Sequence, residues 1–182
     1  MRSGWLSYPR PTFSQLQKYW LFRQGVLTEG LRQFGYLQLR VVSEYSDRLS
    51  ESEAWMLQHS VGQPIWVREI LMSIDNIDCV FARSFTSLDA SKGLWKGMRQ
   101  LRTRPIGDIL HHNSQVHRSR FFATRLSLQE PIYKSAKRCL QENCPAPSRM
   151  LARCSVFVRS EQPLLVAECF LPKFWMLAGE FS

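Results

Sequence analysis

The sequence predicts a single α+β domain built around an antiparallel sheet. Two helical segments come first, and segments with strand-like patterns dominate after residue 36. These later segments follow one another through short, turn-forming connections. Parallel strands would need long crossovers between them, whereas antiparallel strands can be joined by hairpins. A chain of 182 residues also has the size of one ordinary domain. We therefore expect one domain over residues 1–182, with residues 1–11 as a loose N-terminal arm.

The first two helices are predicted from residues that begin or end helices. Residues 12–22 form the first, with Thr12 or Ser14 as its capping residue. Residues 26–34 form the second, which ends at Gly35 because glycine readily adopts the backbone conformation that follows a helix. Residues 88–101 are expected to be irregular or helical. Further helical turns are expected over residues 52–59 and 105–112.

The strands are predicted from apolar alternation and turn residues. Residues 36–43 alternate between apolar and polar side chains, which is the period of a strand. Residues 65–73 and 78–86 form a hairpin, because Asp75 and Asn76 between them favour a tight turn. The remaining strands are expected over residues 119–128, 150–158 and 163–171, and residues 131–147 are expected to be a polar surface excursion.

Charge and composition indicate an anionic partner without choosing it. Lys and Arg number 24 against 15 Asp and Glu, a net charge of +9. Such a balance suits nucleic acid, a membrane surface or an acidic small molecule. No apolar run approaches the roughly 20 residues of a membrane helix, and no secretory signal follows Met1, so a soluble cytoplasmic protein is expected. The five cysteines have no C-x-x-C spacing, which favours reduced thiols over disulfides or zinc.

Two further groups of residues have weak functional interpretations. His111 and His112 are adjacent, so on a helix they point in different directions and no metal site is expected. A set of arginines either forms a solvated basic face or steers an anionic ligand or RNA. Its members are Arg99, Arg102, Arg104, Arg118, Arg120 and Arg125.

Three ionisable residues share predicted strand faces with large apolar side chains. Arg68 and Glu168 alternate with apolar neighbours, and Arg83 lies between two phenylalanines. Burying such groups is costly without a partner. One interpretation is that they pair within the sheet, for example Arg68 with Glu168, or reach its edge. The other is an enclosed anion site, where a guanidinium binds a carboxylate through two hydrogen bonds and the carboxylate of Glu168 meets a hydroxyl.

Four segments give the chain a resemblance to the chorismate pyruvate-lyase family. Their order and spacing fit that family over residues 19–175. The segments are residues 66–71 (WVREIL), 81–85 (FARSF), 104–110 (RPIGDIL) and 164–172 (LLVAECFLP).

The resemblance implies an antiparallel sheet whose helices cover an enclosed ligand site. It also implies an enzyme that converts chorismate to 4-hydroxybenzoate and pyruvate, without metal or organic cofactor, toward a quinone such as ubiquinone or plastoquinone. In this sequence Arg68 would hold the ring carboxylate and Glu168 would meet the 4-hydroxyl. Backbone groups at Ile106 would complete the carboxylate site, and Leu27 would close the pocket. Because the product keeps both contacts, product inhibition is expected. The protein is also expected to be a monomer, with no nucleic-acid partner and no stable membrane insertion.

Departures from the family pattern are modest. Ile106 and Leu27 stand where Leu and Met are expected, and both contacts would use the backbone. Ala82 stands where Gly is expected, which would slightly reshape the pocket. From its position between two phenylalanines, we hypothesise that Arg83 faces the enolpyruvyl carboxylate of the substrate.

Two alternatives belong to other functional classes. Ligand-sensing domains of some transcription regulators share the fold of this family, and they bind without turnover. Such domains usually follow a winged helix-turn-helix unit, and residues 1–35 show none. An RNA-binding protein would suit the charge, but no RNP, KH or zinc-knuckle signature is present.

Overall fold

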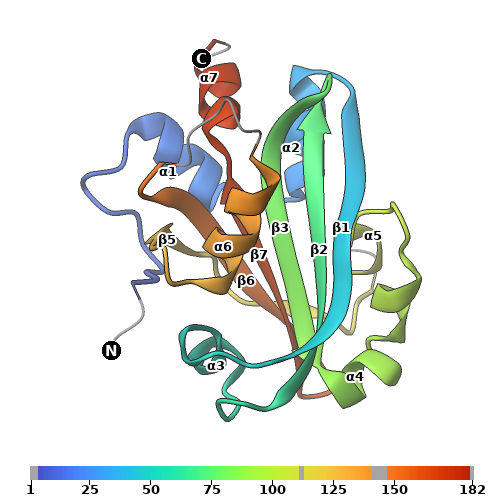
Figure 1. Ribbon diagram of the computed structural model, residues 1–182. Coiled ribbons are helices and arrows are strands. Elements are labelled where there is room, and N and C mark those ends of the chain that lie inside the picture. The colour runs from blue at the N-terminus through green and yellow to red at the C-terminus, as the bar shows by residue number, and fades with distance from the viewer. Residues whose placement is uncertain (1–3, 111–112, 141–146, 181–182) are drawn as a thin grey trace.

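A seven-stranded antiparallel sheet forms the centre of the molecule. The structure, a computed structural model, describes residues 4–110, 113–140 and 147–180 (Figure 1). The strand order is β1-β2-β3-β7-β6-β4, and β5 also pairs with β6. The predicted α+β class is therefore confirmed. The strands are β1 (Leu37–Arg48), β2 (Pro64–Ile74), β3 (Ile77–Ser87), β4 (His117–Arg118), β5 (Phe122–Leu126), β6 (Met150–Arg159) and β7 (Gln162–Phe170).

Short helices connect the strands and flank the sheet. The α-helices are α1 (Gln15–Phe22), α2 (Leu27–Leu31), α3 (Glu51–Leu57), α4 (Leu88–Lys92), α5 (Gly107–Leu110), α6 (Pro131–Cys139) and α7 (Pro172–Glu180). The 3-10 helices are η1 (Arg32–Phe34) and η2 (Lys96–Gln100). Ser14 caps α1 in a reciprocal pair of hydrogen bonds with Gln17, as one of the two predicted caps. Asp75 and Asn76 have positive φ angles of 48° and 66°, which confirms the tight turn between β2 and β3.

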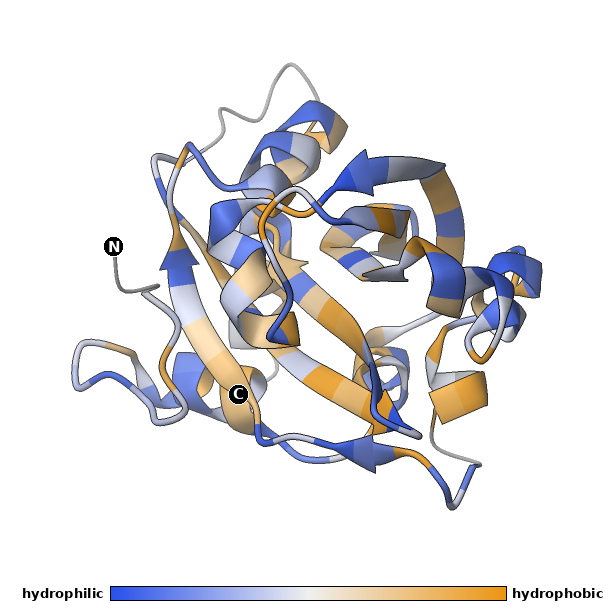
Figure 2. Ribbon diagram, turned by 90° about the horizontal axis from the view of Figure 1, so that it is seen from below, coloured by the Kyte–Doolittle hydropathy of each residue, from blue (hydrophilic) through white to orange (hydrophobic). Residues whose placement is uncertain are grey.

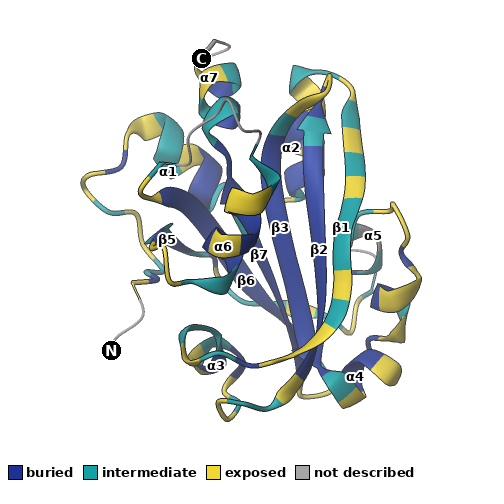
Figure 3. Ribbon diagram, in the orientation of Figure 1, coloured by how far each residue is buried: buried dark blue, intermediate teal, exposed yellow. Residues whose placement is uncertain are grey.

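The sheet is buried at its centre and exposed at one edge. Strands β2, β3 and β7 are buried along most of their length, whereas β1 alternates between exposed and half-buried residues (Figure 3). β1 runs to Arg48, further than the predicted residues 36–43, and its register with β2 shifts between Val41 and Ser43. The shift places Glu44 opposite Arg68 of β2.

The two faces of the sheet carry separate hydrophobic clusters. One face packs against α3 and α6 through residues such as Leu57 and Ile132. The opposite face packs against α1, α2 and α7, through Leu21, Leu27 and Phe174. Figure 2 shows hydrophobic residues along much of the central strands, and hydrophilic residues in the peripheral loops, on the helices and at strand ends. Adjacent residues on a strand point to opposite faces, so their side chains pack in different hydrophobic clusters.

A close contact between α1 and α2 sets the position of α2. A Cβ atom at Gly30 would lie 2.2 Å from Nη1 of Arg23 and 3.1 Å from the Trp20 ring. Glycine at this position lets the two helices approach. This packing places the beginning of α2, at Leu27, over the sheet.

Two expectations about the periphery need correction. Residues 1–11 are not a loose arm at Trp5 and Leu6, because Trp5 is buried and Leu6 exchanges two backbone hydrogen bonds with Ala123. The excursion predicted over residues 131–147 begins as helix α6, whose Ile132 and Ala136 are buried; residues 141–146 lie outside the described part. Helix α7 and strand β4 were not predicted.

Candidate functional site

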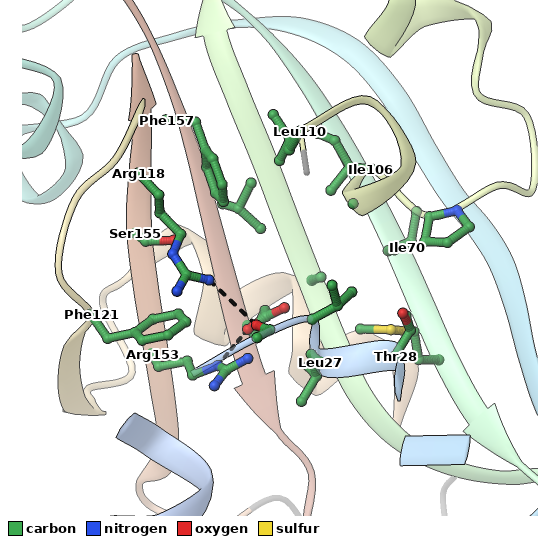
Figure 4. Close-up of a pocket in the computed structure, with 18 residues that line it drawn as sticks. Leu27, Thr28, Ile70, Ile106, Leu110, Arg118, Phe121, Arg153, Ser155 and Phe157 are labelled. Carbon is green, nitrogen blue, oxygen red and sulfur yellow. Dashed lines mark hydrogen bonds and ion pairs between the residues drawn. The ribbon is translucent and has the colours of Figure 1, made fainter. Parts of the chain in front are cut away.

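A cavity lies between the sheet and the segments that contain α2 and α5. It contains about 550 Å³ of atom-free space, including its opening to solvent. β2, β3, β7 and β6 form its floor, and α2 lies across it (Figure 4). Its apolar walls include Leu27, Ile70, Met72, Ala82, Ile106, Phe157 and Val166. Its polar lining includes Thr28, Arg118, Arg153, Ser155 and Glu168.

Glu168 and Arg153 form an ion pair in this cavity. They are register partners on β7 and β6, and Arg153 Nε donates to Glu168 Oε2 at 2.6 Å. Arg153 Nη1 also donates to the carbonyls of Trp20 and Arg23, at 3.1 and 3.2 Å. The guanidinium lies 4.3 Å from the centre of the Phe121 ring. These contacts fix the guanidinium, and the fixed guanidinium orients the carboxylate.

Arg118 is a second cation in the lining. Its Nη1 donates to the carbonyl of Gly25 at 3.3 Å, and its Nη2 donates to Gln24 Oε1 at 2.9 Å. Burial lowers the pKa of Arg118, the nearby charge of Arg153 lowers it further, and Glu168 partly offsets both effects. The cavity therefore has an excess of positive charge on its β6 side.

Arg68 lies beside the cavity rather than in its wall. It is 1% exposed and forms an ion pair with Glu44. Its Nη2 donates to the carbonyl of Arg102 and, at 3.4 Å, to that of Arg104. Pro105, the next residue, does line the cavity. Arg68 thus contacts the backbone of Arg104, immediately before the segment that begins to line the cavity at Pro105.

Leu27 and Ile106 both line the cavity. The resemblance implied that Leu27 closes the pocket and that the backbone at Ile106 binds the ring carboxylate. Leu27 is the first residue of α2 and is buried. Ile106 precedes α5. The structure therefore brings Leu27, Ile106 and Glu168 to one cavity and places Arg68 at its border.

Arg83 is not at the cavity, so the hypothesis that it faces the substrate is withdrawn. Its neighbour Ala82 lines the cavity, and Arg83 points to the opposite face of the sheet. There its Nε lies 2.9 Å from Glu53 Oε1, and its Nη1 lies 2.9 Å from Glu69 Oε1 and 2.7 Å from Tyr45 Oη. Burial opposes the charge, but these oxygens more than offset it and raise the pKa of Arg83.

The suggested mutual pairing of these charged residues was wrong, because each of the three has partners other than the remaining two. Arg68 pairs with Glu44, and Glu168 pairs with Arg153. Arg83 binds Glu53 and Glu69. For Glu168 the pair does not exclude contact with a ligand hydroxyl, because its side chain remains 15% exposed and lines the cavity.

Arg153 was not predicted as a site residue, and Arg118 was predicted only as a member of a general basic group. The same alternation that selected Glu168 applies to β6, where Arg153, Ser155 and Phe157 all line the cavity. Arg118 had no comparable signal, because β4 is only two residues long.

No helix in the described ranges is long and apolar enough to cross a membrane. His111 and His112, from which no metal site was expected, lie outside those ranges.

Solved structures share the fold at low sequence identity. The C-terminal domain of PhnF has a TM-score of 0.58 and 15% identity, over 84% of this chain and 91% of that domain. A GntR-family transcriptional regulator from Bacillus cereus has a TM-score of 0.54 and 12% identity, over 75% and 92% of the two chains. At these identities the likeness concerns the fold alone.

Sequence comparison is more specific. A family model described as chorismate lyase matches residues 3–179. The chain is 50% identical to the "Probable chorismate pyruvate-lyase" of Bordetella pertussis over 175 residues, 96% of this chain and 92% of that protein. It is 34% identical to "Probable chorismate pyruvate-lyase 1" of Pseudomonas entomophila over 182 residues, 100% and 96% of the two chains. With the cavity on the sheet, these matches show that the chain belongs to the chorismate lyase family.

Proposed function

We propose that this protein eliminates pyruvate from chorismate and leaves 4-hydroxybenzoate, which feeds quinone biosynthesis as the family resemblance implies. The observation that carries the proposal is the placement of Arg68 and Glu168 on one face of the sheet. Ala82 of β3 is the register partner of both Ile70 on β2 and Glu168 on β7. Arg68 precedes Ile70 by two residues on the same face, so it lies two strands and two residues away from Glu168. With strand spacing near 4.8 Å and a rise near 3.4 Å, their Cα atoms lie about 12 Å apart.

That separation suits a ring with a carboxylate and a para hydroxyl. The guanidinium of Arg68 would bind the carboxylate, and the carboxylate of Glu168 would accept from the hydroxyl. Leu27, Ile70 and Val166 line the cavity near these two residues and would contact the ring. The cavity thus offers an apolar slot and an acceptor, and Arg68 at its border would supply the cation.

The reaction needs little from the protein beyond position and charge. The C4–H bond breaks and its electron pair forms the last double bond of the aromatic ring. The C3–O bond breaks, and its electron pair leaves on the enolpyruvyl oxygen. The proton lost at C4 is balanced by one gained at the methylene carbon, which gives pyruvate. The protein holds the reactive conformer, excludes water and stabilises the departing charge.

Glu168 has two possible roles in this step, to orient the 4-hydroxyl or to receive the C4 proton. Arg153 is a positioning residue in either case, because its Nε donates to the carboxylate of Glu168. Arg68 must exchange Glu44 for the ring carboxylate when substrate binds.

The product keeps both polar groups that the proposed site recognises. 4-Hydroxybenzoate should therefore compete with chorismate, and its release should require movement of α2 away from Leu27. Steady-state inhibition by added 4-hydroxybenzoate would measure this.

The direct test is incubation of the purified, EDTA-treated protein with chorismate, with both products followed by chromatography. Equal amounts of 4-hydroxybenzoate and pyruvate are expected. Arg68→Met should weaken binding of 4-hydroxybenzoate strongly, whereas Arg32→Met removes a charge outside the cavity lining and should leave it unchanged. Tight binding of chorismate without turnover would instead assign the chain a sensing role. The absence of both turnover and binding would refute the proposal.

A further inference from the structure

The cavity has a mouth, and Arg118 lies at it. An outer hollow on the surface shares Gly25, Leu110, Arg118 and Phe157 with the cavity lining. Arg118 is the one charged residue among these shared, described residues. Figure 4 shows its side chain extending toward the cavity on the same side as Arg153. A ligand that passes between hollow and cavity must therefore pass this guanidinium.

The charges of the lining leave Arg118 available for an anion. Arg153 binds Glu168 and two backbone carbonyls, so its charge is matched within the cavity. The hydrogen-bond partners of Arg118, Gln24 and a backbone carbonyl, are both neutral. A guanidinium has five N–H donors, so these two bonds leave donors for a carboxylate.

The chemistry of chorismate places its second carboxylate on this side. If the 4-hydroxyl meets Glu168, the enolpyruvyl ether on the adjacent ring carbon also lies near β6 and β7. Resting on the proposed function, we propose that Arg118 binds the enolpyruvyl carboxylate of chorismate and that pyruvate leaves through the outer hollow.

Arg118 would then act on the departing group during elimination. As the C3–O bond breaks, its electron pair develops as charge on the enolpyruvyl oxygen, next to the carboxylate that Arg118 holds. A guanidinium at that place stabilises the charge of the leaving group, and so lowers the barrier as well as the KM. Once the methylene carbon has gained a proton, pyruvate is already bound at the exit.

The contact with Gln24 also gives Arg118 a structural role, which must be separated from carboxylate binding. Arg118 Nη2 bonds Gln24 Oε1 at 2.9 Å, which ties β4 to the connection between α1 and α2. If Arg118 only held this connection in place, its loss would weaken the binding of all ligands of the cavity equally. A carboxylate-binding role affects only the ligand that carries the enolpyruvyl group.

The test compares Arg118→Gln with Arg120→Gln, a control that removes the same charge from an exposed position outside the cavity lining. Arg118→Gln should lower kcat/KM for chorismate about ten- to hundred-fold, the range of a lost charge-assisted hydrogen bond. It should change the Kd of 4-hydroxybenzoate, which lacks the enolpyruvyl group, by less than about two-fold by the same reasoning. Arg118→Lys should restore part of the activity.

Three results would overturn the inference. The first is an Arg118→Gln variant with the same kcat/KM as Arg120→Gln. The second is an Arg118→Gln variant that loses 4-hydroxybenzoate binding as strongly as chorismate turnover. The third is a Gln24→Ala variant that loses as much kcat/KM as Arg118→Gln. Circular dichroism and thermal unfolding of each variant show that it is folded. If the unchanged protein fails to turn over chorismate, the proposed function itself fails, which is distinguishable from failure at Arg118 alone.

Discussion

Arg153 and Glu168 face each other across β6 and β7, with Nε and Oε2 2.6 Å apart, while the rest of the Arg153 guanidinium is bound to carbonyls at the end of α1. One ion pair therefore connects the proposed catalytic carboxylate to the helices that cover the site. This relationship makes the position of the carboxylate depend on the packing of α1.

Glu168→Gln should keep the fold and lose most of the turnover. The amide has nearly the same shape and can still accept a hydrogen bond from Arg153, but it cannot receive the C4 proton. Loss of a general base costs about 10²- to 10⁴-fold in kcat. Steady-state assays should compare it with Glu29→Gln, which neutralises an exposed carboxylate of α2. Full turnover by Glu168→Gln would rule out proton transfer and leave only orientation.

Glu44→Gln should tighten the binding of 4-hydroxybenzoate. Glu44 occupies Arg68 in the ligand-free protein, so the ring carboxylate must compete with it. An amide competes less well for a guanidinium than a carboxylate does. Titration calorimetry should show a lower Kd, and Glu161→Gln, in the exposed turn between β6 and β7, should show no change. A weaker affinity in Glu44→Gln would mean that Glu44 positions Arg68 instead of competing for it.

Arg83→Met should destabilise the protein without altering the cavity. Removing the guanidinium leaves Glu69 and Glu53, at 3% and 12% exposure, without their ion-pair partner. Breaking a buried ion pair in this way costs about 3–5 kcal/mol of unfolding free energy. Urea denaturation would measure the loss, and adding Glu69→Gln should recover part of it. The Kd of 4-hydroxybenzoate should stay the same in the folded fraction, and a large rise would return Arg83 to the site.

The buried thiols should resist alkylation in the native protein. Burial raises the pKa of Cys79 to about 11, and it raises the pKa of Cys154 and Cys169 as well. The reactive thiolate is therefore scarce near neutral pH, and the sulfur atoms are also inaccessible. All three have free thiols, as expected from the sequence. Iodoacetamide labelling followed by peptide mass spectrometry should modify them only after denaturation, and rapid native labelling would contradict their burial.

The pattern of apolar residues was enough to predict the sheet and part of the site. Alternation on β7 selected Glu168, and the turn at Asp75 and Asn76 placed the hairpin. Alternation on a single strand shows which residues share a face, but it does not show which face meets the cavity. Arg83 and Arg68 looked equivalent for that reason, and only the pairing of β2 with β3 separates them.

Other features depended on tertiary contacts that no local pattern encodes. Trp5 is fixed because a hydrophobic cluster receives its ring, although the residues around it resemble a loop. Helix α6 forms in a polar segment because Ile132, Tyr133 and Ala136 fall on one helical face and pack on the sheet. Strand alternation could have selected Arg153, but its contact with the Trp20 carbonyl of α1 joins residues 133 positions apart and has no local signal.

The alternation of Ala82 and Arg83 also bears on which changes of chain length the protein can accept. A one-residue deletion in β3 would turn the arginine into the cavity and the alanine into the cluster around Glu69, and would exchange every other pair along the strand in the same way. A library of single-residue insertions and deletions should therefore lose nearly all members altered within β2 or β3. Tolerated length variants should gather in surface connections, such as residues 58–63, where no residue pairs with the central strands.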